Sequence, residues 1–315
     1  MAKEKTIGMC ALCKKKKVEL MKSHIIPKAI YERTRTYKDS RFRNFYNLKD
    51  VHQNGEHKPL LCHDCEEFFS WYETKFIKLF LDKYLSSPDS PLPIITKDAE
   101  FYILTVAWRI LYDGLYNLNS YMGNDERKYF GEYERKLSKY LFARYLEKNP
   151  NENDARIEAY ESDIDGEYFF EEMIPEMEMW EKSIPPEDMS EIKSYIYKIG
   201  DLGFTDEVNS LFHSIIFGDI FCDATKKKYY IISGYNGLII TTVYQRKRNV
   251  WFQCNRKLFR KALKTDEVVK KDITEHLIRR LIEIKNDYPK VQKKLDEDGL
   301  RDKIQKRYEG KQKLK

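Results

Sequence analysis

Two short cysteine motifs, Cys10-Ala11-Leu12-Cys13 and Cys62-His63-Asp64-Cys65, decide the fold of the N-terminal region, and 48 residues separate them. Zn²⁺ favours four soft ligands at the corners of a tetrahedron, and each Cys-x-x-Cys turn aims two sulfurs at one point. In a chain without a secretory signal, such pairs indicate metal binding rather than disulfides. Because four thiolates close the coordination shell, we expect a structural Zn²⁺ on all four cysteines. The alternative is two unrelated pairs of buried thiols.

The remaining two cysteines, Cys222 and Cys254, stand alone in apolar, strand-like surroundings. A single thiol among apolar residues behaves as a small hydrophobic side chain. We therefore expect both to be core residues.

The composition is typical of a folded, non-membrane protein. The chain has 315 residues, of which 42% are hydrophobic and 34% charged, enough for two domains or for a small module on a larger body. The most apolar helical segment, residues 101–118, contains Arg109 and Asp113, which argues against a membrane span. The first ten residues contain no apolar signal region, so we expect a cytoplasmic location.

The charge is unevenly distributed along the chain. Residues 1–50 contain 14 Lys and Arg against 5 Asp and Glu, and residues 251–315 contain 20 against 11, whereas residues 51–250 contain 23 against 35. Two basic ends flanking an acidic middle favour a polyanionic partner such as nucleic acid. The alternative is an ordinary solvated charged surface.

The pattern of residues predicts an α+β fold. Thr96 is placed to cap a helix over residues 97–119 that is apolar on nearly every face and is therefore expected in the core. Asn236-Gly237 lies between two β-branched runs and predicts a hairpin. Further predictions are a helix over 125–148, mixed helix and loop over 149–190, a small antiparallel sheet over 192–254 that includes the run 210–221, and helix over 258–308.

Composition also suggests boundaries between regions. Residues 86–96 contain three prolines and three serines and are the clearest linker in the chain. The predicted regions are 1–85 for a cysteine module, 86–96 for the linker, 97–190 for a helical region with an acidic stretch, and 191–315 for an α+β region with basic C-terminal helices.

Ser23-His24-Ile25-Ile26-Pro27-Lys28 lies between the two cysteine motifs. Cys-x-x-Cys, then His-Ile-Ile-Pro, then Leu-Cys-x-x-Cys opening a helix resembles the HNH nuclease family in its zinc-stabilised ββα-metal, or treble-clef, form. The resemblance covers about residues 8–85. It implies a small zinc-bound ββα-metal module, followed here by a mainly helical body with a small antiparallel sheet.

The resemblance also implies a chemistry. In the family, the first histidine is the general base that activates water, and a divalent ion stabilises the phosphate. By that pattern His24 is the base, and Mg²⁺ or Mn²⁺ is the catalytic ion. The alternative for His24 is a packed core histidine beside Ile25 and Ile26.

The chain departs from the family pattern at the expected catalytic ion. Ser23 stands where the family usually has Asp, and Glu66 stands where it usually has His or Asn. Glu66 offers a carboxylate, a good ligand for Mg²⁺ or Mn²⁺. Candidates for additional ligands are His63 and Asp64, and candidates for the family's middle Asn are Asn47, Asn54 and His57.

Basic and aromatic residues are interleaved around this motif. Cations neutralise phosphates and aromatic rings can stack on bases, so we expect this region to bind DNA. The alternative is a solvated loop with aromatics packed beneath it. The candidate DNA contacts are Lys14, Lys15, Lys16, Lys17, Lys28, Arg41 and Arg43. After Cys65, an aromatic stripe that we expect to be core comprises Phe68, Trp71, Phe76, Phe80 and Tyr84.

Three functions remain open from the sequence. The first is an HNH-type DNA endonuclease with His24 and Glu66 in its site, in a setting that resembles bacterial defence or a mobile element. The second is a catalytically inactive zinc module that binds nucleic acid or protein. The third is that the sheet over residues 192–254 carries a separate function, such as partner binding, with a protein partner contacted through residues 97–254.

Overall fold

In the computed structural model the chain divides into two compact units. One unit comprises residues 1–35 and 55–253, and the other comprises residues 36–54 and 254–315. No helix among the described residues is long and apolar enough to cross a membrane. The described residues are 5–34, 42–43, 51–52, 55–116, 122–149, 189, 191–223, 227–245 and 266–297.

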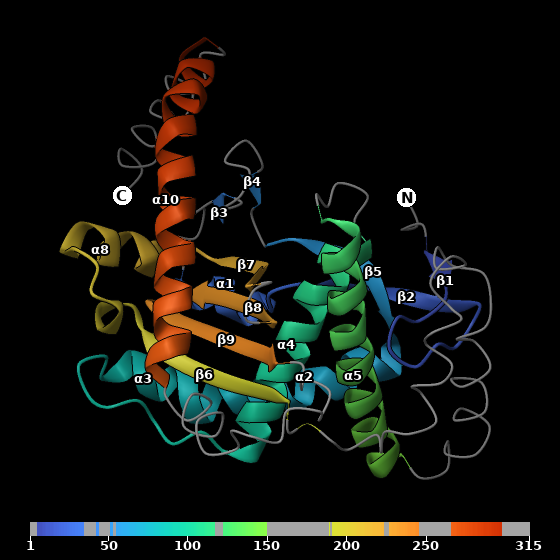
Figure 1. The fold of residues 1–315 in the computed structure, drawn as a ribbon. Coiled ribbons are helices and arrows are strands. Elements are labelled where there is room, and N and C mark those ends of the chain that lie inside the picture. The colour runs from blue at the N-terminus through green and yellow to red at the C-terminus, as the bar shows by residue number, and fades with distance from the viewer. Residues whose placement is uncertain are drawn as a thin grey trace, which may run out of the picture. The chain divides into compact units, whose positions relative to one another are not determined.

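The N-terminal part of the first unit is a small antiparallel sheet with a helix packed on it (Figure 1). Its strands are β1 (Ile7–Gly8), β2 (Val18–His24) and β5 (His57–Cys62), in the order β1-β2-β5. Helix α2 (His63–Phe76) begins directly after β5, as expected for a cysteine motif that opens a helix. The helix continues through a π-helical turn, η1 (Ile77–Leu81), and α3 (Asp82–Ser86), while α1 (Lys28–Thr34) follows β2.

The aromatic stripe along these helices is mostly core, with one correction. Trp71 is 42% exposed, and the neighbouring Tyr72 is buried in its place. The reason is the helical period: Tyr72 lies four residues after Phe68 and shares its face, whereas Trp71 lies at the edge of that face. The ring of Trp71 is covered by the ammonium groups of Lys75 and Lys148, 3.7 and 3.1 Å from its centroid. The stripe is confirmed for Phe68, Phe76, Phe80 and Tyr84.

Helix α4 (Lys97–Tyr116) is the central helix, as predicted, and is buried along most of its length. The Thr96 hydroxyl accepts a hydrogen bond from the backbone N–H of Ala99 at 3.2 Å, which confirms the predicted cap. Helix α5 (Asn124–Lys148) packs beside α4. The Trp108 indole of α4 donates to α5 at two points, Glu134 Oε1 and Ser138 Oγ, both at 2.8 Å.

A four-stranded antiparallel sheet follows, in the order β6-β9-β8-β7. Asn236 and Gly237, between β8 and β9, have φ values of 52° and 73°, both in the left-handed region. Two consecutive residues with positive φ form the kind of two-residue turn whose twist matches that of the flanking strands. The predicted hairpin is therefore confirmed. The strands are β6 (Ile192–Lys198), β7 (Phe217–Asp223), β8 (Lys228–Tyr235) and β9 (Leu238–Gln245).

One predicted strand run contains a helix instead. Residues 210–214 belong to α8 (Asp206–Ser214), which follows a 3₁₀ turn, η4 (Ile199–Leu202). Thr205 and Asp206 favour a helix start, and the run is one-sided in the way of a surface helix. Phe212 is buried while its neighbour Leu211 is 40% exposed.

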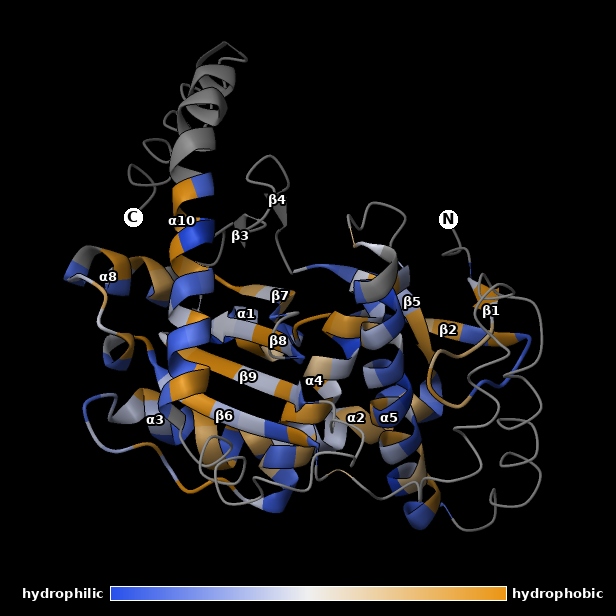
Figure 2. Cartoon of the chain, in the orientation of Figure 1, coloured by the Kyte–Doolittle hydropathy of each residue, from blue (hydrophilic) through white to orange (hydrophobic). Residues whose placement is uncertain are grey.

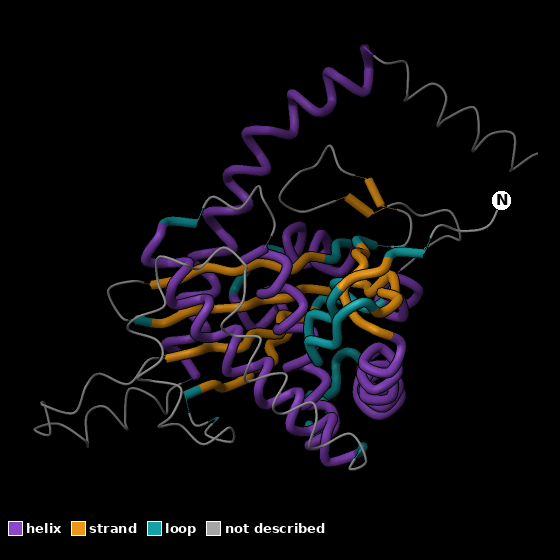
Figure 3. The backbone as a smooth tube through the Cα atoms, turned by 90° about the vertical axis from the view of Figure 1, so that its right-hand side faces the viewer, coloured by secondary structure: helices purple, strands orange, loops and turns teal. Residues whose placement is uncertain are grey.

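Helix α4 packs against both α2 and the larger sheet. A Cβ atom at Gly218 of β7 would lie 2.8 Å from Ile110 of α4, so the glycine permits this close approach. Figure 2 contrasts the mainly hydrophobic β9 with the mainly hydrophilic α5, and Figure 3 shows the strands of the larger sheet side by side. The boundaries predicted at residues 85, 96 and 190 stay predictions.

The second unit contains a short hairpin and a long helix. Strands β3 (Phe42–Arg43) and β4 (Val51–His52) pair antiparallel, and α10 (Asp266–Glu297) lies within the predicted helix 258–308. Ile273 and Leu277 of its apolar face are fully buried. The predictions for residues 150–188 and for 246–265, with Cys254, lie outside the described residues.

Candidate metal centre and adjacent histidine site

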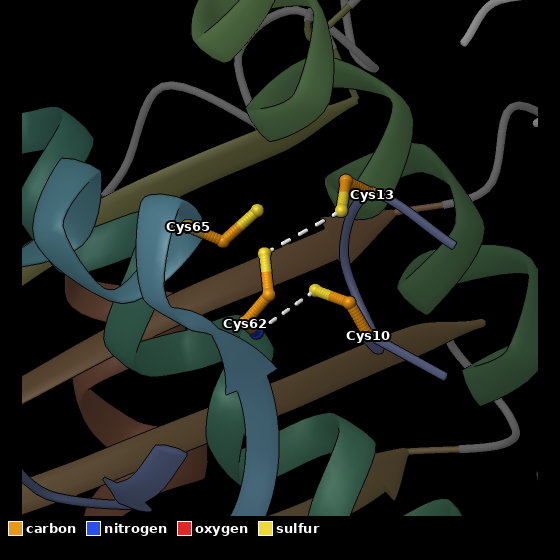
Figure 4. A group of neighbouring side chains, drawn as sticks. All are labelled: Cys10, Cys13, Cys62 and Cys65. Atoms are coloured by element: carbon orange, nitrogen blue, oxygen red, sulfur yellow. Dashed lines mark hydrogen bonds between the residues drawn. The ribbon is translucent and has the colours of Figure 1, made fainter. Parts of the chain in front are cut away.

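The four cysteines predicted to bind zinc come together in the first unit. Their sulfur atoms all lie within 4.8 Å of one another, and all four residues are buried. Figure 4 shows the sulfurs pointing toward a common centre, with 3.7 Å between Cys13 Sγ and Cys62 Sγ. A tetrahedral zinc with Zn–S bonds of about 2.3 Å places its sulfurs about 3.8 Å apart. This donor set fits a metal ion such as Zn²⁺.

The local backbone explains why the sulfurs converge. Lys14 adopts a φ of 55°, and the backbone N–H of Cys10 donates to Lys15 O at 3.0 Å, so the chain after Cys10 turns back on itself. The backbone N–H of Cys62 donates to Cys10 Sγ at 3.3 Å. Cys65 lies in the first turn of α2, where the positive end of the helix dipole favours a thiolate.

Four sulfurs this close cannot all be ionised without a counter-charge. The pKa of the Cys10 thiol lies well below its ordinary value because Cys13, Cys62 and Cys65 donate hydrogen bonds to its sulfur. The pKa of Cys65 is raised for the complementary reason, since it donates first of all to Cys10. A bound dication would allow all four thiols to ionise. Because the unfolded chain has no such site, the free energy of metal binding would stabilise the folded state.

The predicted base, His24, lies at the other end of the same pair of strands. Strands β2 and β5 pair from Leu20 opposite Cys62 to His24 opposite His57. The rings of His24 and His57 are 5.5 Å apart between centroids. Of the three residues considered for the family's middle Asn, His57 is the one that the structure brings to His24. Asn47 and Asn54 lie outside the described residues.

The two residues that depart from the family pattern contact each other. The buried Ser23 hydroxyl donates to Glu66 Oε2 at 2.6 Å. Arg109 Nη2, from α4, lies 3.5 Å from Glu66 Oε1, and its side chain is only 2% exposed, against 28% for Glu66. Ser23 is therefore a partner of Glu66, and Glu66 joins β2, α2 and α4.

The surroundings of His24 favour its neutral form. Its pKa is lowered from 6.5, first by burial and then by the electrostatic effects of His57, Arg109 and Lys28, while Glu66 opposes the shift. A neutral imidazole has a free nitrogen lone pair, as a general base requires. The adjacent Ile25 and Ile26 are buried, whereas His24 itself is half-buried. This exposure argues against the alternative of a packed core histidine.

A second carboxylate near this group was missed from the sequence. Glu73 lies seven residues after Glu66 on α2, and this spacing returns to the same helical face. Its pKa is raised by burial, against the opposing effects of Arg109 and of a hydrogen bond from the backbone N–H of Ala29. The seven-residue spacing was the available signal, but only a search two turns beyond Glu66 would have found it.

The expected Mg²⁺ or Mn²⁺ has no assembled set of ligands. Among the described residues, the four cysteines are the only group of three or more His, Cys, Asp and Glu whose ligand atoms come together. Both oxygens of Glu66 are already engaged, one of them beside a buried cation. His63 and Asp64 are 72% and 49% exposed, and His63 Nδ1 lies 3.8 Å from Asp64 Oδ1 and 4.0 Å from Glu67 Oε2. These residues do not fit a resident divalent ion.

The candidate DNA contacts fall at different places. Lys15, Lys16 and Lys17 are exposed in the loop before β2, while Lys14 donates to Ala11 O at 2.7 Å. The seven residues of β2 span about 20 Å, so this loop and His24 lie at opposite ends of the strand.

The other basic candidates lie elsewhere. Lys28 is 55% exposed at the start of α1 and forms an ion pair with Glu32. Arg43 lies in β3 of the second unit, and Arg41 lies outside the described residues. Cys222, expected in the core, is half-buried and donates to Glu126 Oε1 at 3.2 Å, and burial raises its pKa to about 12.

Comparison with models of protein families, with curated proteins and with solved structures gives no match for this chain.

Proposed function

We propose that the chain hydrolyses phosphodiester bonds in DNA as an HNH-like endonuclease, with His24 as the general base. The observation that carries the proposal is the placement of His24. It ends a strand of a strand–strand–helix unit clamped by four cysteines, with a pKa lowered below 6.5. The zinc we propose at the cysteines has a structural role, because four thiolates leave no open position for a substrate.

The reaction adds water across one P–O bond. His24 takes a proton from a water molecule, and the water oxygen bonds to phosphorus as the bond to the leaving oxygen breaks. The leaving oxygen takes up a proton, so the products are an alcohol and a phosphomonoester. Ser23 and Arg109 hold Glu66, whose charge acts on His24. A general base contributes about 100- to 10,000-fold in rate.

Lys28 and the exposed Lys15, Lys16 and Lys17 support DNA as the substrate. The positive charge of Lys28 contributes to lowering the pKa of His24, so this ammonium group is near enough to the proposed base to attract a DNA phosphate to it. The lysine loop lies about 20 Å away along β2, within the length that a short duplex covers. DNA held along the strand would contact both ends.

Plasmid nicking tests the proposal. The zinc-loaded wild type should convert supercoiled DNA to the nicked form, and His24→Ala should lower this rate at least 100-fold while zinc content is retained. His63→Ala is the matched control, because it removes an exposed imidazole from the same module. Each protein is assayed with Mg²⁺, with Mn²⁺ and with neither, which also tests the expected ion requirement. Equal rates for wild type and His24→Ala would refute the assignment of the base.

The second candidate is a zinc module that binds nucleic acid without cleaving it. The observation that favours it is the engagement of both Glu66 oxygens by Ser23 and Arg109. Binding that is salt-dependent, together with no nicking under any of the three ion conditions, would establish this alternative over hydrolysis.

A further inference from the structure

Two charged residues of α4 face the N-terminal strands and helix. Arg109 lies beside Glu66 of α2, and Asp113, one helical turn later, forms an ion pair with Lys58 of β5. Residues four apart share a helical face. Beyond the first turn, these two residues are the only charged ones in α4. The central helix therefore meets the zinc-binding region through these two ion pairs and a third near its start, between Asp98 and Lys75 of α2, and the Arg109 pair reaches the His24 site.

The guanidinium of Arg109 is deeply buried and incompletely partnered. Its side chain is 2% exposed, its contact with Glu66 is long at 3.5 Å, and its Nε has no hydrogen-bond partner among the described residues. The guanidinium carbon lies 5.0 Å from the centre of the Phe69 ring. Burying a cation is costly unless charges compensate it, so a buried arginine of this kind needs a reason in its surroundings.

The surroundings of Arg109 are two carboxylates and a histidine. Glu66 and Glu73 share one face of α2, and both lie within the electrostatic reach of Arg109, as does His24. Such a pair of carboxylates beside a histidine attracts a cation. A divalent ion is one solution, and a protein guanidinium is another that requires no ion and cannot lose its charge.

We propose that Arg109, contributed by α4, is a positioning residue of the His24 site: it fixes Glu66 beside Ser23 and supplies the positive charge that a divalent ion would otherwise bring. This proposal deepens the proposed function, since it concerns the same site. It also explains why the described residues assemble no ligand set for Mg²⁺ or Mn²⁺. The zinc-binding region then depends on α4 for its chemistry as well as for its packing.

The electrostatic part is tested without any assay of cleavage. NMR titration of the His24 ring in the zinc-loaded full chain should show a higher pKa in Arg109→Gln, because a neighbouring positive charge has been removed. Arg109→Lys should keep the wild-type value. The groups that face His24 and act on its titration are His57, Glu66, Arg109 and Lys28.

Asp113→Asn is the matched control. It removes the ion pair between α4 and β5, so a general loosening of the packing would shift the His24 pKa in this variant too. Glu66→Gln serves if Arg109→Gln does not fold, and it should move the His24 pKa downward, opposite to Arg109→Gln. An unchanged His24 pKa in folded Arg109→Gln, or a shift equal to that in Asp113→Asn, would overturn the proposal.

Direct Mn²⁺ binding to the zinc-loaded protein, without DNA, tests the second part. Wild type and Glu66→Gln should bind Mn²⁺ equally weakly, because Arg109 already supplies the charge at Glu66. One Mn²⁺ per wild-type chain that is absent from Glu66→Gln would overturn the idea that Arg109 replaces an ion. Failure of the nuclease proposal would leave both the titration and the Mn²⁺ result intact, so the two ideas fail separately.

Discussion

The four-cysteine cluster and the His24 site share one pair of strands and one helix, yet they are built differently. The cluster draws on two motifs with two sulfurs each, and close-range turns aim those sulfurs inward. The His24 site takes residues from β2, β5, α2 and α4, and Arg109 reaches it from helix α4, outside the cysteine region. The first is self-contained, whereas the second depends on the body of the protein.

This difference predicts which substitutions damage which site, and the largest effect is expected at the cysteines. Cys62→Ser should remove the zinc and unfold the N-terminal strands and α2, because metal-binding energies in small zinc modules reach about 10–16 kcal/mol. Zinc content and circular dichroism measure both effects. Cys222→Ser, at a half-buried thiol on β7, should retain one zinc per chain. A well-folded, zinc-free Cys62→Ser protein would contradict the structural role.

A smaller loss is expected when the support from α4 is weakened. Trp108→Ala removes a fully buried ring and two hydrogen bonds to α5, and it should lower the free energy of unfolding by about 3–5 kcal/mol. Trp71→Ala is the control, since that ring is 42% exposed, and it should cost about 1 kcal/mol.

Trp108→Ala also distinguishes the cysteine cluster from the His24 site. This variant should keep its zinc while its nicking activity disappears, because Arg109 is the next residue on α4. Chemical denaturation and metal analysis together check this. Loss of zinc in folded Trp108→Ala would show that the cluster is not self-contained.

The sequence predicted the cluster in full and the second site only in part. Cysteine spacing is local and specific, so Cys10, Cys13, Cys62 and Cys65 were identified together. His24 and Glu66 came from a resemblance, and the Ser23–Glu66 hydrogen bond was not foreseen because its partners lie 43 residues apart. Arg109 was seen only as a charge that excludes a membrane span. Its role depends on how α4 packs on α2, which no local pattern encodes.

The fold shows the same division. Local signals gave the Thr96 cap, the Asn236-Gly237 hairpin and the buried α4, all of which the structure confirms. The prediction of strand over residues 210–221 was wrong for residues 210–214, which belong to α8. The aromatic and β-branched residues of this run favoured a strand, and the helix-start signal at Thr205 was given too little weight. The prediction that Trp71 is a core residue was wrong. Trp71 lies at the edge of the buried helical face, and whether a residue at that edge is buried depends on tertiary packing.

The smallest predicted effect concerns the exposed lysine loop. Replacing Lys15, Lys16 and Lys17 with Gln should weaken DNA binding and reduce the slope of log affinity against log salt by at most about 0.9 for each phosphate that these lysines neutralise. The matched control replaces three exposed lysines elsewhere, Lys78, Lys97 and Lys193, with the same change in net charge. Equal reductions in the two triple variants would mean that the loop does not bind DNA specifically.

The pH dependence of plasmid nicking tests the central claim most directly. In the proposed mechanism the neutral form of His24 is the base. Its pKa is lowered from 6.5, so the rate should be level near pH 7 and fall as the pH drops below about 6.5. His24→Ala should be at least 100-fold slower near pH 7 and should lack this acid limb, with its zinc retained. A His24→Ala protein with the rate and pH profile of the wild type would contradict the account.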